Sequence, residues 1–275
     1  MWVNGEAVDA AAPSIGALDH GVTVGDGAFE TCKIVAGMPF ALDRHARRLD
    51  RSLAGLGLPP ADHSVIDAGI KAVLAGERIV SGRLRYTVTG GAGPLGSDRD
   101  ASPLTYIVTA APQPAIPDTG KLVVVPWTRN ERGATSGLKT TSYAENVVAL
   151  AYAQERGGVE ALFMNSIGNL CECTGSNVFV VVDGGILTPD LASGPLAGVT
   201  RELVIEWCRE EGMTVRAVPL PMTILDQAQE VFITSSTKDV WGIHAIDDQP
   251  VAAPGPVTAR AVEIFGRLSR ESLDP

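Results

Sequence analysis

The sequence predicts an α+β protein built from two domains. Strand-like and helix-like segments occur in both halves of the 275-residue chain, which is long enough for one large domain or two small ones. Three prolines, Pro112, Pro114 and Pro117, lie between the two halves. Because proline can continue neither a helix nor a central strand, they predict a linker over 111–120. We therefore expect a small N-terminal domain over 1–110 and a larger C-terminal domain over 121–275.

The N-terminal half opens with Asn4-Gly5 between short apolar alternations, which is a strong hairpin signal. Apolar patterning predicts strands over 28–35, 83–89 and 104–110, and helices over 43–54 and 61–75. Asp43 can cap the first of these helices, and Gly55 is expected to end it.

The C-terminal half also mixes strands and helices. Apolar runs predict strands over 121–126, 160–164, 170–173, 177–182, 215–218 and 230–234. Helices are expected over 143–155, 200–211 and 258–269. Gly157-Gly158 and Gly212 follow the first two helices and are expected to end them.

Composition limits the classes of partner. The net charge of −10 argues against nucleic acid, because a phosphate backbone needs a basic surface. No apolar run reaches the roughly 18 residues of a membrane helix, and no signal peptide is visible, so we expect a cytoplasmic protein without a membrane partner. The four cysteines match no zinc or redox spacing. We expect them to be reduced thiols, and we expect no metal site.

Lysine is scarce in this chain, with five lysines against seventeen arginines. Arginine can replace lysine on a solvated surface but cannot form an imine, so each retained lysine is of interest. Lys139 lies just before a predicted helix, whose dipole disfavours the ammonium form and helps a nucleophilic amine. Judged by spacing alone, an ordinary loop lysine at a helix start is the simpler interpretation.

Two further segments could bind an anion. Residues 198–201 precede a helix, and the unpaired N–H groups of a helix start attract anions, although a simple threonine cap at Thr200 is by itself the simpler interpretation. Residues 234–237 place four consecutive hydroxyls at the end of an apolar strand. Such a run suits a phosphate or a carboxylate, and it also suits a turn.

Glu172 and Arg48 are the remaining charged candidates. Glu172 lies in an otherwise apolar strand, where a carboxylate needs a cationic or hydrogen-bonding partner unless it faces outward. Arg48 belongs to an arginine pair on a predicted helix. Such a pair is usually solvated, but one member could point inward and hold a phosphate with two hydrogen bonds.

Together, and in this order, these segments resemble the fold-type IV pyridoxal-phosphate enzymes, which include branched-chain and D-amino-acid aminotransferases, (R)-amine transaminases and aminodeoxychorismate lyases. The resemblance runs from 24–30 through His45-x-x-Arg48 and Lys139 to Glu172-x-x-x-x-Asn177-x-Phe179, and then through 198–201 to 234–237. It implies a small N-terminal α/β domain and a larger C-terminal domain with a mostly antiparallel, barrel-like sheet and flanking helices. It also implies pyridoxal 5'-phosphate as cofactor and a homodimer.

The resemblance implies roles for individual residues. Lys139 would carry the cofactor as a Schiff base and move a proton during catalysis. Glu172 would pair with the pyridine nitrogen of the cofactor and keep it protonated. The other cofactor-binding residues would be Arg48, Tyr143, Asn177, Val199, Thr200 and Ser236, with the phosphate bound by Arg48, Ser236 and the backbone of Val199 and Thr200.

The substrate positions implied by the resemblance are Val22, Phe29, Leu95, Ser97 and Thr237. D-amino-acid aminotransferases carry a tyrosine near the position of Val22, and an arginine and a histidine near Leu95 and Ser97. This chain has none of these three side chains there. Arg99 is close in sequence and could replace the missing arginine.

The resemblance leaves several reactions open. The first is an aminotransferase that moves an amino group from an amino acid, mainly a D-amino acid and also small (R)-amines, to a 2-oxo acid. The second is an aminodeoxychorismate lyase that forms 4-aminobenzoate and pyruvate, since residues 24–31 are close to sequences of that subgroup. A branched-chain L-amino-acid aminotransferase is a further alternative, and a non-catalytic ligand-binding protein on the same scaffold is another.

Overall fold

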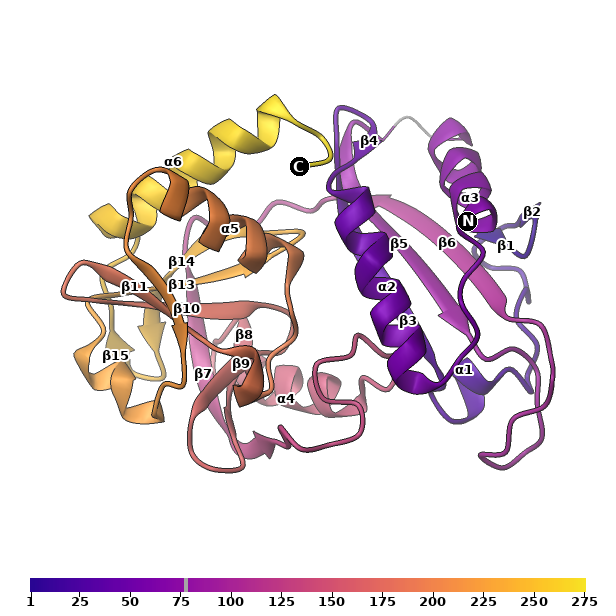
Figure 1. The fold of residues 1–275 in the computed structure, drawn as a ribbon, viewed down its shortest axis with the longest axis horizontal. Helices are drawn as coiled ribbons and strands as arrows, with labels where there is room; N and C mark the ends of the chain where they lie inside the picture. Colours follow the sequence, from indigo (N-terminus) through magenta and orange to yellow (C-terminus); the bar gives the residue numbers. More distant parts are fainter. Residues whose placement is uncertain (77–78) are drawn as a thin grey trace. The chain divides into compact units, whose positions relative to one another are not determined.

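The computed structural model describes residues 1–76 and 79–275, and Figure 1 shows its elements. The chain forms two compact units, residues 1–114, 138–143 and 273–275 in the first, and 115–137 and 144–272 in the second. The sequence assigned 138–143 and 273–275 to the C-terminal domain, whereas their contacts join them to the first unit. Backbone hydrogen bonds explain this, because Phe29 N donates to Lys139 O and Ala41 N donates to Leu273 O.

The first unit contains one antiparallel six-stranded sheet in the order β2-β1-β6-β5-β3-β4. Its strands are β1 (Trp2–Val3), β2 (Glu6–Ala7), β3 (Gly27–Val35), β4 (Met38–Pro39), β5 (Ser81–Thr89) and β6 (Thr105–Pro112). Its helices are α1 (His20–Thr23), α2 (Leu42–Leu56) and α3 (His63–Gly76). The expected hairpin, strands and two helices of this half are therefore confirmed.

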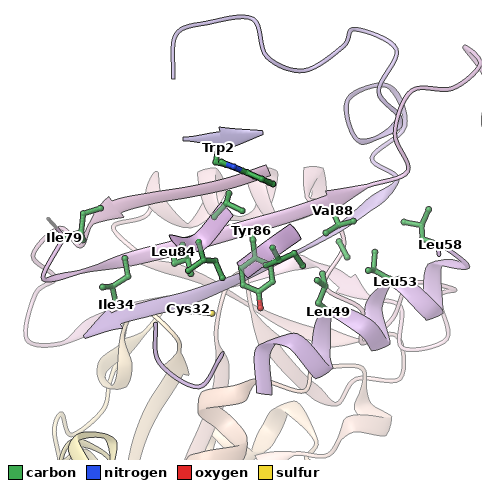
Figure 2. Packing of buried hydrophobic residues seen from close by; sticks show 14 residues of the cluster. Trp2, Cys32, Ile34, Leu49, Leu53, Leu58, Ile79, Leu84, Tyr86 and Val88 are labelled. Carbon is green, nitrogen blue, oxygen red and sulfur yellow. The ribbon is translucent and has the colours of Figure 1, made fainter. Parts of the chain in front are cut away.

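The apolar core of the first unit lies between the sheet and the helices α2 and α3. Figure 2 shows Leu49 and Leu53 of α2 directed toward Tyr86 and Val88 of β5. Strand alternation places the neighbouring side chain Arg85 on the opposite face of the sheet. The sheet thus has one helix-covered face and one face that carries charged and aromatic side chains.

Both ends of α2 differ from the prediction. Gly57, with φ +70°, caps the C-terminus, because its left-handed conformation closes the last turn. Gly55 lies inside the helix, where an added Cβ would come within 2.7 Å of Leu138. At the other end Asp43 does not act as the cap. Its backbone N–H instead donates to the carboxylate of Asp274 at 3.1 Å.

The second unit contains a nine-stranded mixed sheet in the order β12-β11-β10-β13-β14-β7-β8-β9, with β15 paired to β14. The pairs β7–β8, β7–β14 and β11–β12 are parallel and the others antiparallel. The end strand β9 also contacts β10, so the sheet curls. Its strands are β7 (Gly120–Arg129), β8 (Glu160–Asn165), β9 (Leu170–Cys173), β10 (Asn177–Val182), β11 (Gly185–Pro189), β12 (Val215–Val218), β13 (Glu230–Ser235), β14 (Asp239–Ile246) and β15 (Gln249–Pro250).

Three helices belong to this unit, α4 (Ala144–Gln154), α5 (Val199–Glu210) and α6 (Pro256–Glu271), with short 3-10 turns at Leu191–Ser193 and Met222–Gln227. The expected two-domain α+β class and its mostly antiparallel second sheet are confirmed. All four cysteines are free and buried. Within the described chain, no helix is long and apolar enough to cross a membrane.

Three strands of the second unit, β11, β14 and β15, were not predicted. The β14 segment contains Gly242 and His244 and begins at Asp239 with φ +53°, so it lacks the local pattern of a strand. It forms because β13 and β7 pair with it from both sides. Strand β7 in turn continues past Pro126, where its pairing with β8 is interrupted because proline has no N–H to donate.

Candidate active site

Lys139 is held against the first unit by its backbone. Its N–H donates to the hydroxyl of Ser52 on α2 at 3.1 Å, and its carbonyl accepts from Phe29 N of β3 at 3.0 Å. The hydroxyl of Ser52 also donates to the carbonyl of Arg48, one turn earlier on the helix. Lys139 is therefore fixed by two elements of the unit, which is more order than an ordinary loop lysine requires.

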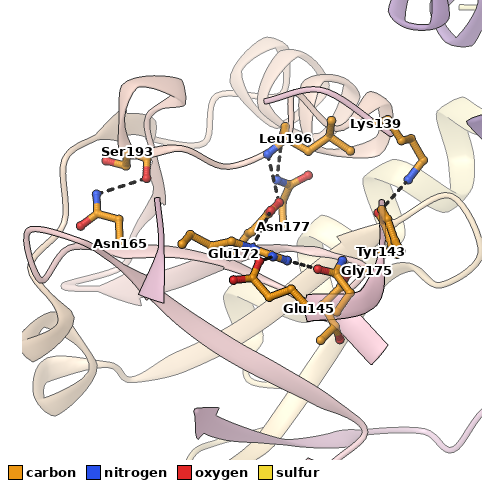
Figure 3. A network of polar contacts seen from close by, with 12 residues as sticks. Lys139, Tyr143, Glu145, Asn165, Glu172, Gly175, Asn177, Ser193 and Leu196 are labelled. Carbon is orange, nitrogen blue, oxygen red and sulfur yellow. Dashed lines mark hydrogen bonds and ion pairs between the residues drawn. The ribbon is translucent and has the colours of Figure 1, made fainter. Parts of the chain in front are cut away.

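The side chain of Lys139 lies among aromatic rings. Its Nζ lies 3.4 Å from the hydroxyl of Tyr143 (Figure 3). The same Nζ lies 4.4 Å from the centroid of the Phe29 ring. The rings of Phe29 and Tyr143 meet edge to face at 5.1 Å. The structure thus brings together three predicted site residues, Lys139, Tyr143 and Phe29, around one amine.

Arg48 points into the protein and not toward solvent. Its Nε and Nη2 donate to the two oxygens of Glu30 at 2.8 and 2.6 Å, and His45 Nδ1 lies 2.7 Å from Glu30 Oε2. Burial by itself would raise the pKa of Glu30, but the charge and hydrogen bonds of Arg48, assisted by His45, lower it to about 2. Burial lowers the pKa of His45 despite the nearby carboxylate.

This buried cluster has two consequences for the predicted site. Two of the three guanidinium nitrogens of Arg48 are committed to Glu30, so its role in phosphate binding stays a prediction. Glu30 itself was missed by the sequence reasoning. A glutamate in the β3 segment, facing the same side as the apolar Cys32 and Ile34, was the available signal.

Glu172 projects from β9 in the second unit and has two partners. Its Oε2 accepts from the backbone N–H of Leu196 at 3.0 Å, and its Oε1 lies 3.6 Å from Nε of Arg129 (Figure 3). The cation that the sequence required beside this carboxylate is thus present within the protein. Arg129, which also pairs with Glu145 and Asn146, was missed because it lies some forty residues earlier in the chain.

Glu160 of β8 accepts hydrogen bonds from the turn that follows Glu172. This buried carboxylate accepts from the Thr174 hydroxyl, the Gly175 N–H and the Ser176 hydroxyl at 3.1, 2.8 and 2.6 Å, and it also pairs with Lys238. Three of these donors lie in the β9–β10 turn, so one carboxylate holds that turn in a single geometry. The positions of Glu172 and Asn177, on either side of that turn, follow from it.

Asn177 and the start of α5 form one contact. The Asn177 amide donates to the carbonyl of Leu196 at 2.8 Å, and its Oδ1 would lie only 2.0 Å from a Cβ placed on Gly198. Gly198 is the N-cap of α5, and no side chain caps this helix. The first N–H groups of α5, around the buried Val199 and Thr200, are therefore available to an anion.

The hydroxyl segment follows β13 as a turn. In the part of the chain that the structure describes, the buried hydroxyls of Thr234 and Ser235 have no hydrogen-bond partner. Ser236 and Thr237 are half-buried in the turn that leads to β14. Buried polar atoms without partners are rare, and they are typical of places where a ligand completes the hydrogen bonding.

The structure does not bury the substrate positions that the resemblance implies near Val22 and in the loop of Leu95 and Ser97. Val22, Leu95 and Ser97 are all exposed, Leu95 at 82%. Arg99 is held in a forked pair with Asp26, with both N–O distances 2.6 Å, and its Nη1 donates to the carbonyl of Gly57. The guanidinium of Arg99 is thus engaged within the unit, which argues against it as the replacement for the missing loop arginine.

Comparisons with known proteins agree with these observations. The family model described as Amino-transferase class IV matches residues 27–246. The chain belongs to the class IV aminotransferases. A D-alanine aminotransferase of Bacillus licheniformis is 30% identical over 93% of this chain and 92% of that protein. An aminodeoxychorismate lyase of Bacillus subtilis is 27% identical over 90% of this chain and 87% of that protein.

The fold is also that of a solved relative. The branched-chain amino acid aminotransferase of Escherichia coli has a TM-score of 0.90 at 24% identity, covering 97% of this chain and 93% of the other. Class IV aminotransferases depend on pyridoxal 5'-phosphate, and this chain is such an enzyme. The resemblance to the fold-type IV enzymes is therefore confirmed.

The residues of this chain fit the cofactor. The second unit offers a helix start without a side-chain cap and, at the end of β13, the buried hydroxyls of Thr234 and Ser235, which have no partner among the described residues. Glu172 offers a carboxylate of suitable charge for a protonated ring nitrogen. The first unit offers an amine, on Lys139, held between aromatic rings.

Proposed function

We propose that this class IV aminotransferase moves an amino group from an amino acid to a 2-oxo acid, with D-amino acids and small (R)-amines among the donors. The observation that carries the proposal is the side-chain amine of Lys139, which lies against the Tyr143 hydroxyl while Ser52 and Phe29 hold the backbone of Lys139. The D-alanine aminotransferase from Bacillus licheniformis, similar over nearly its whole length, supports this choice of donor.

The cofactor, when bound, supplies a conjugated ring that withdraws electrons from the carbon bearing the amino group. We propose that Lys139 holds the cofactor covalently and accepts and returns the proton of that carbon at Nζ. The Tyr143 hydroxyl, 3.4 Å away, orients this amine.

Glu172 and the anion-binding segments would act on the rest of the cofactor. Glu172, which lies beside Arg129, would pair with the ring nitrogen and keep a proton on it. We assign the phosphate to Arg48, Ser236 and the N–H groups of Val199 and Thr200, with Asn177 holding the loop before α5. Phe29 would line the substrate pocket, and Thr237 would contribute its backbone to substrate binding.

A donor panel tests this function. D-alanine, L-leucine and (R)-1-phenylethylamine would each be added to the cofactor-loaded enzyme, and the change in cofactor absorbance and the appearance of amino product from pyruvate or 2-oxoglutarate would be followed. Transfer from at least one donor is expected, fastest from D-alanine. Faster transfer from L-leucine would favour the branched-chain alternative, and no transfer from any donor would refute the proposal.

A variant of the same enzyme checks the assignment of the lysine. Lys139→Ala is expected to lower turnover by at least about 10²–10⁴-fold, because the proton-transferring group is removed. Lys71→Ala, an exposed lysine on α3, is the matched control and should retain full activity. Full activity in Lys139→Ala would mean that another lysine acts.

A second candidate function has its own support. The aminodeoxychorismate lyase of Bacillus subtilis is similar over 90% of this chain. A lyase would release 4-aminobenzoate from aminodeoxychorismate without any 2-oxo acid acceptor. Formation of 4-aminobenzoate under those conditions, with no transfer from D-alanine, would favour the lyase over the aminotransferase.

A further inference from the structure

Two turns of the second unit carry or adjoin residues that we assign to the cofactor and the substrate. The β9–β10 turn, 174–176, follows Glu172, and the β13–β14 turn, 236–238, contains Ser236 and Thr237. Strands β10 and β13 are antiparallel neighbours in the sheet (Figure 1), and the first residue of β10 pairs with the last but one of β13. The two turns therefore lie at the same end of this strand pair.

One carboxylate, that of Glu160 on β8, contacts both turns. Its Oε2 accepts from the Thr174 hydroxyl and the Gly175 N–H, and its Oε1 accepts from the Ser176 hydroxyl. The ammonium of Lys238, in the other turn, pairs with the same Oε1. Glu160 is buried, with only 4% of its side chain exposed. A buried charge needs a charged or hydrogen-bonding partner, and within the described chain Lys238 is the cation that pairs with it.

Lys238 is held in the β13–β14 turn along its whole length. Its backbone N–H donates to the carbonyl of Ser235 at 3.3 Å, and its Nζ lies 5.1 Å from the centroid of the Trp241 ring. Only 19% of its side chain is exposed. Ion pairs that are shielded from water in this way are screened by salt much less than surface pairs. The pair with Glu160 is therefore suited to fix the geometry of the turn.

We propose that Lys238 is a positioning residue for the cofactor site: its ion pair with Glu160 fixes the β13–β14 turn on the carboxylate that also fixes the β9–β10 turn. Without Lys238, Glu160 keeps its three donors in the β9–β10 turn, and only the β13–β14 turn loses an anchor. Without Glu160, both turns lose one. The inference rests on the proposed roles of Ser236 in phosphate binding and of Thr237 in substrate binding.

The test compares the apoenzymes of the wild type, Lys238→Met, Lys238→Arg, Glu160→Gln and the double variant Glu160→Gln/Lys238→Met. Lys121→Met is the matched control, because Lys121 lies in the same unit but outside both turns, and its partner Asp248 has 98% of its side chain exposed. Dissociation constants would be measured for pyridoxal 5'-phosphate by absorbance titration and for inorganic phosphate by calorimetry. Thermal unfolding of each apoenzyme shows whether the variant is folded.

Lys238→Met is expected to weaken the binding of the cofactor and of inorganic phosphate by the same factor, about tenfold, because the turn that carries Ser236 loses its anchor. The absorbance maximum of the bound cofactor should stay at its wild-type position, since the turn after Glu172 is still held. In the loaded enzyme, KM for D-alanine should rise about threefold while kcat changes by less than about twofold, because Thr237 is displaced and Lys139 is not.

The other variants separate the ion pair from the bulk of the side chain. Lys238→Arg should bind the cofactor within about threefold of the wild type, because a guanidinium can still donate to Glu160. Glu160→Gln should lose more affinity than Lys238→Met and should also shift the absorbance maximum, because both turns are released. Lys121→Met should match the wild type in every assay.

The double variant decides whether Lys238 acts through Glu160. If it does, the double variant binds the cofactor no more weakly than Glu160→Gln alone. Additive losses would overturn the inference, because Lys238 would then contact the phosphate itself. Unchanged affinity for both ligands in Lys238→Met, an equal loss in Lys238→Arg, or an equal loss in Lys121→Met would overturn it as well.

Two other failures remain distinguishable from failure of the inference. If Glu160→Gln does not fold, the comparison of Lys238→Met with Lys238→Arg and Lys121→Met still decides the role of Lys238. Failure of the proposed function is a separate outcome, because the wild type would then transfer from no donor. The binding constants decide the role of Lys238 in that case too, since they need no turnover.

Discussion

At the residue scale, what each charged side chain of this enzyme can bind depends on the partners that surround it in the fold. Glu172 has Arg129 and the Leu196 N–H, and Arg48 has Glu30 and His45. Except for His45, which lies three residues before Arg48 on α2, these partners come from other elements of the fold. For Glu30, the contacts with Arg48 and His45 lower the pKa despite burial.

A first prediction concerns the two carboxylates that share Arg129. Glu172→Gln is expected to lower kcat roughly 10²-fold, because a neutral amide cannot hold a proton on the ring nitrogen as a carboxylate does. Glu145→Gln is the matched control, since Glu145 also pairs with Arg129 but is half exposed. Steady-state rates with the best donor check this. Equal rates for the two variants would contradict the role of Glu172.

A second prediction concerns the pH dependence of stability. The pKa of Glu30 is lowered from 4.5 to about 2 in the folded protein. Its stabilising contribution, roughly 3 kcal/mol, is therefore complete above about pH 5 and is lost as the pH falls toward 2. Urea unfolding of the wild type should show this decline in the free energy of unfolding.

The variant Glu30→Gln separates this group from the other carboxylates. It is expected to be less stable at pH 7 by about 3–5 kcal/mol, because Arg48 would stay buried without its counter-charge. Its free energy of unfolding should also fall less steeply between pH 5 and 2. A slope equal to that of the wild type would show that Glu30 is not responsible.

At the scale of elements, the start of α5 depends on close packing. Gly198 has no room for a side chain, because Asn177 Oδ1 lies 2.0 Å from the position of a Cβ. The same glycine leaves the helix without a side-chain cap. The local sequence therefore keeps the first N–H groups of α5 free for an anion.

A third prediction follows for this helix start. Gly198→Ala should displace the Asn177 amide, at a cost of about 1–3 kcal/mol, and weaken binding of pyridoxal 5'-phosphate about tenfold or more. Gly76→Ala, at the end of α3 with nothing within 4 Å of its Cβ position, is the control. Equilibrium titration of the apoenzyme with cofactor gives both constants. Unchanged affinity in Gly198→Ala would remove α5 from the phosphate site.

At the scale of the whole molecule, the family resemblance predicts a homodimer. Helix α4 exposes Val147 and Val148, at 65% and 55% of their surface, which supports an interface on this helix. Val148→Glu is expected to raise the dimer dissociation constant, as measured by light scattering across a dilution series. Val262→Glu, on the exposed side of α6, is the control. A wild type that is monomeric at micromolar concentration would contradict the prediction.

Much of the fold was predictable because its signals are local. Hydrophobic periodicity located both major helices of the first unit and most strands, since core-facing residues repeat with the period of the element. Strand β14 was not predictable, because pairing on both sides stabilises a segment whose own pattern is weak. The hydrogen bond at the N-terminus of α2 was not predictable either, because its acceptor, Asp274, lies at the far end of the chain.

The sequence by itself determined the class of fold, the family and the cofactor. A lysine, a strand glutamate, a helix start and a hydroxyl run follow one another in an order that the chain displays without being folded. Only the tertiary structure decided that Glu30 holds Arg48, that Asp26 occupies Arg99, and that Phe29 contacts both Lys139 and Arg85. These contacts depend on the register of strands and on helices packed across long separations, and no local pattern of residues encodes them.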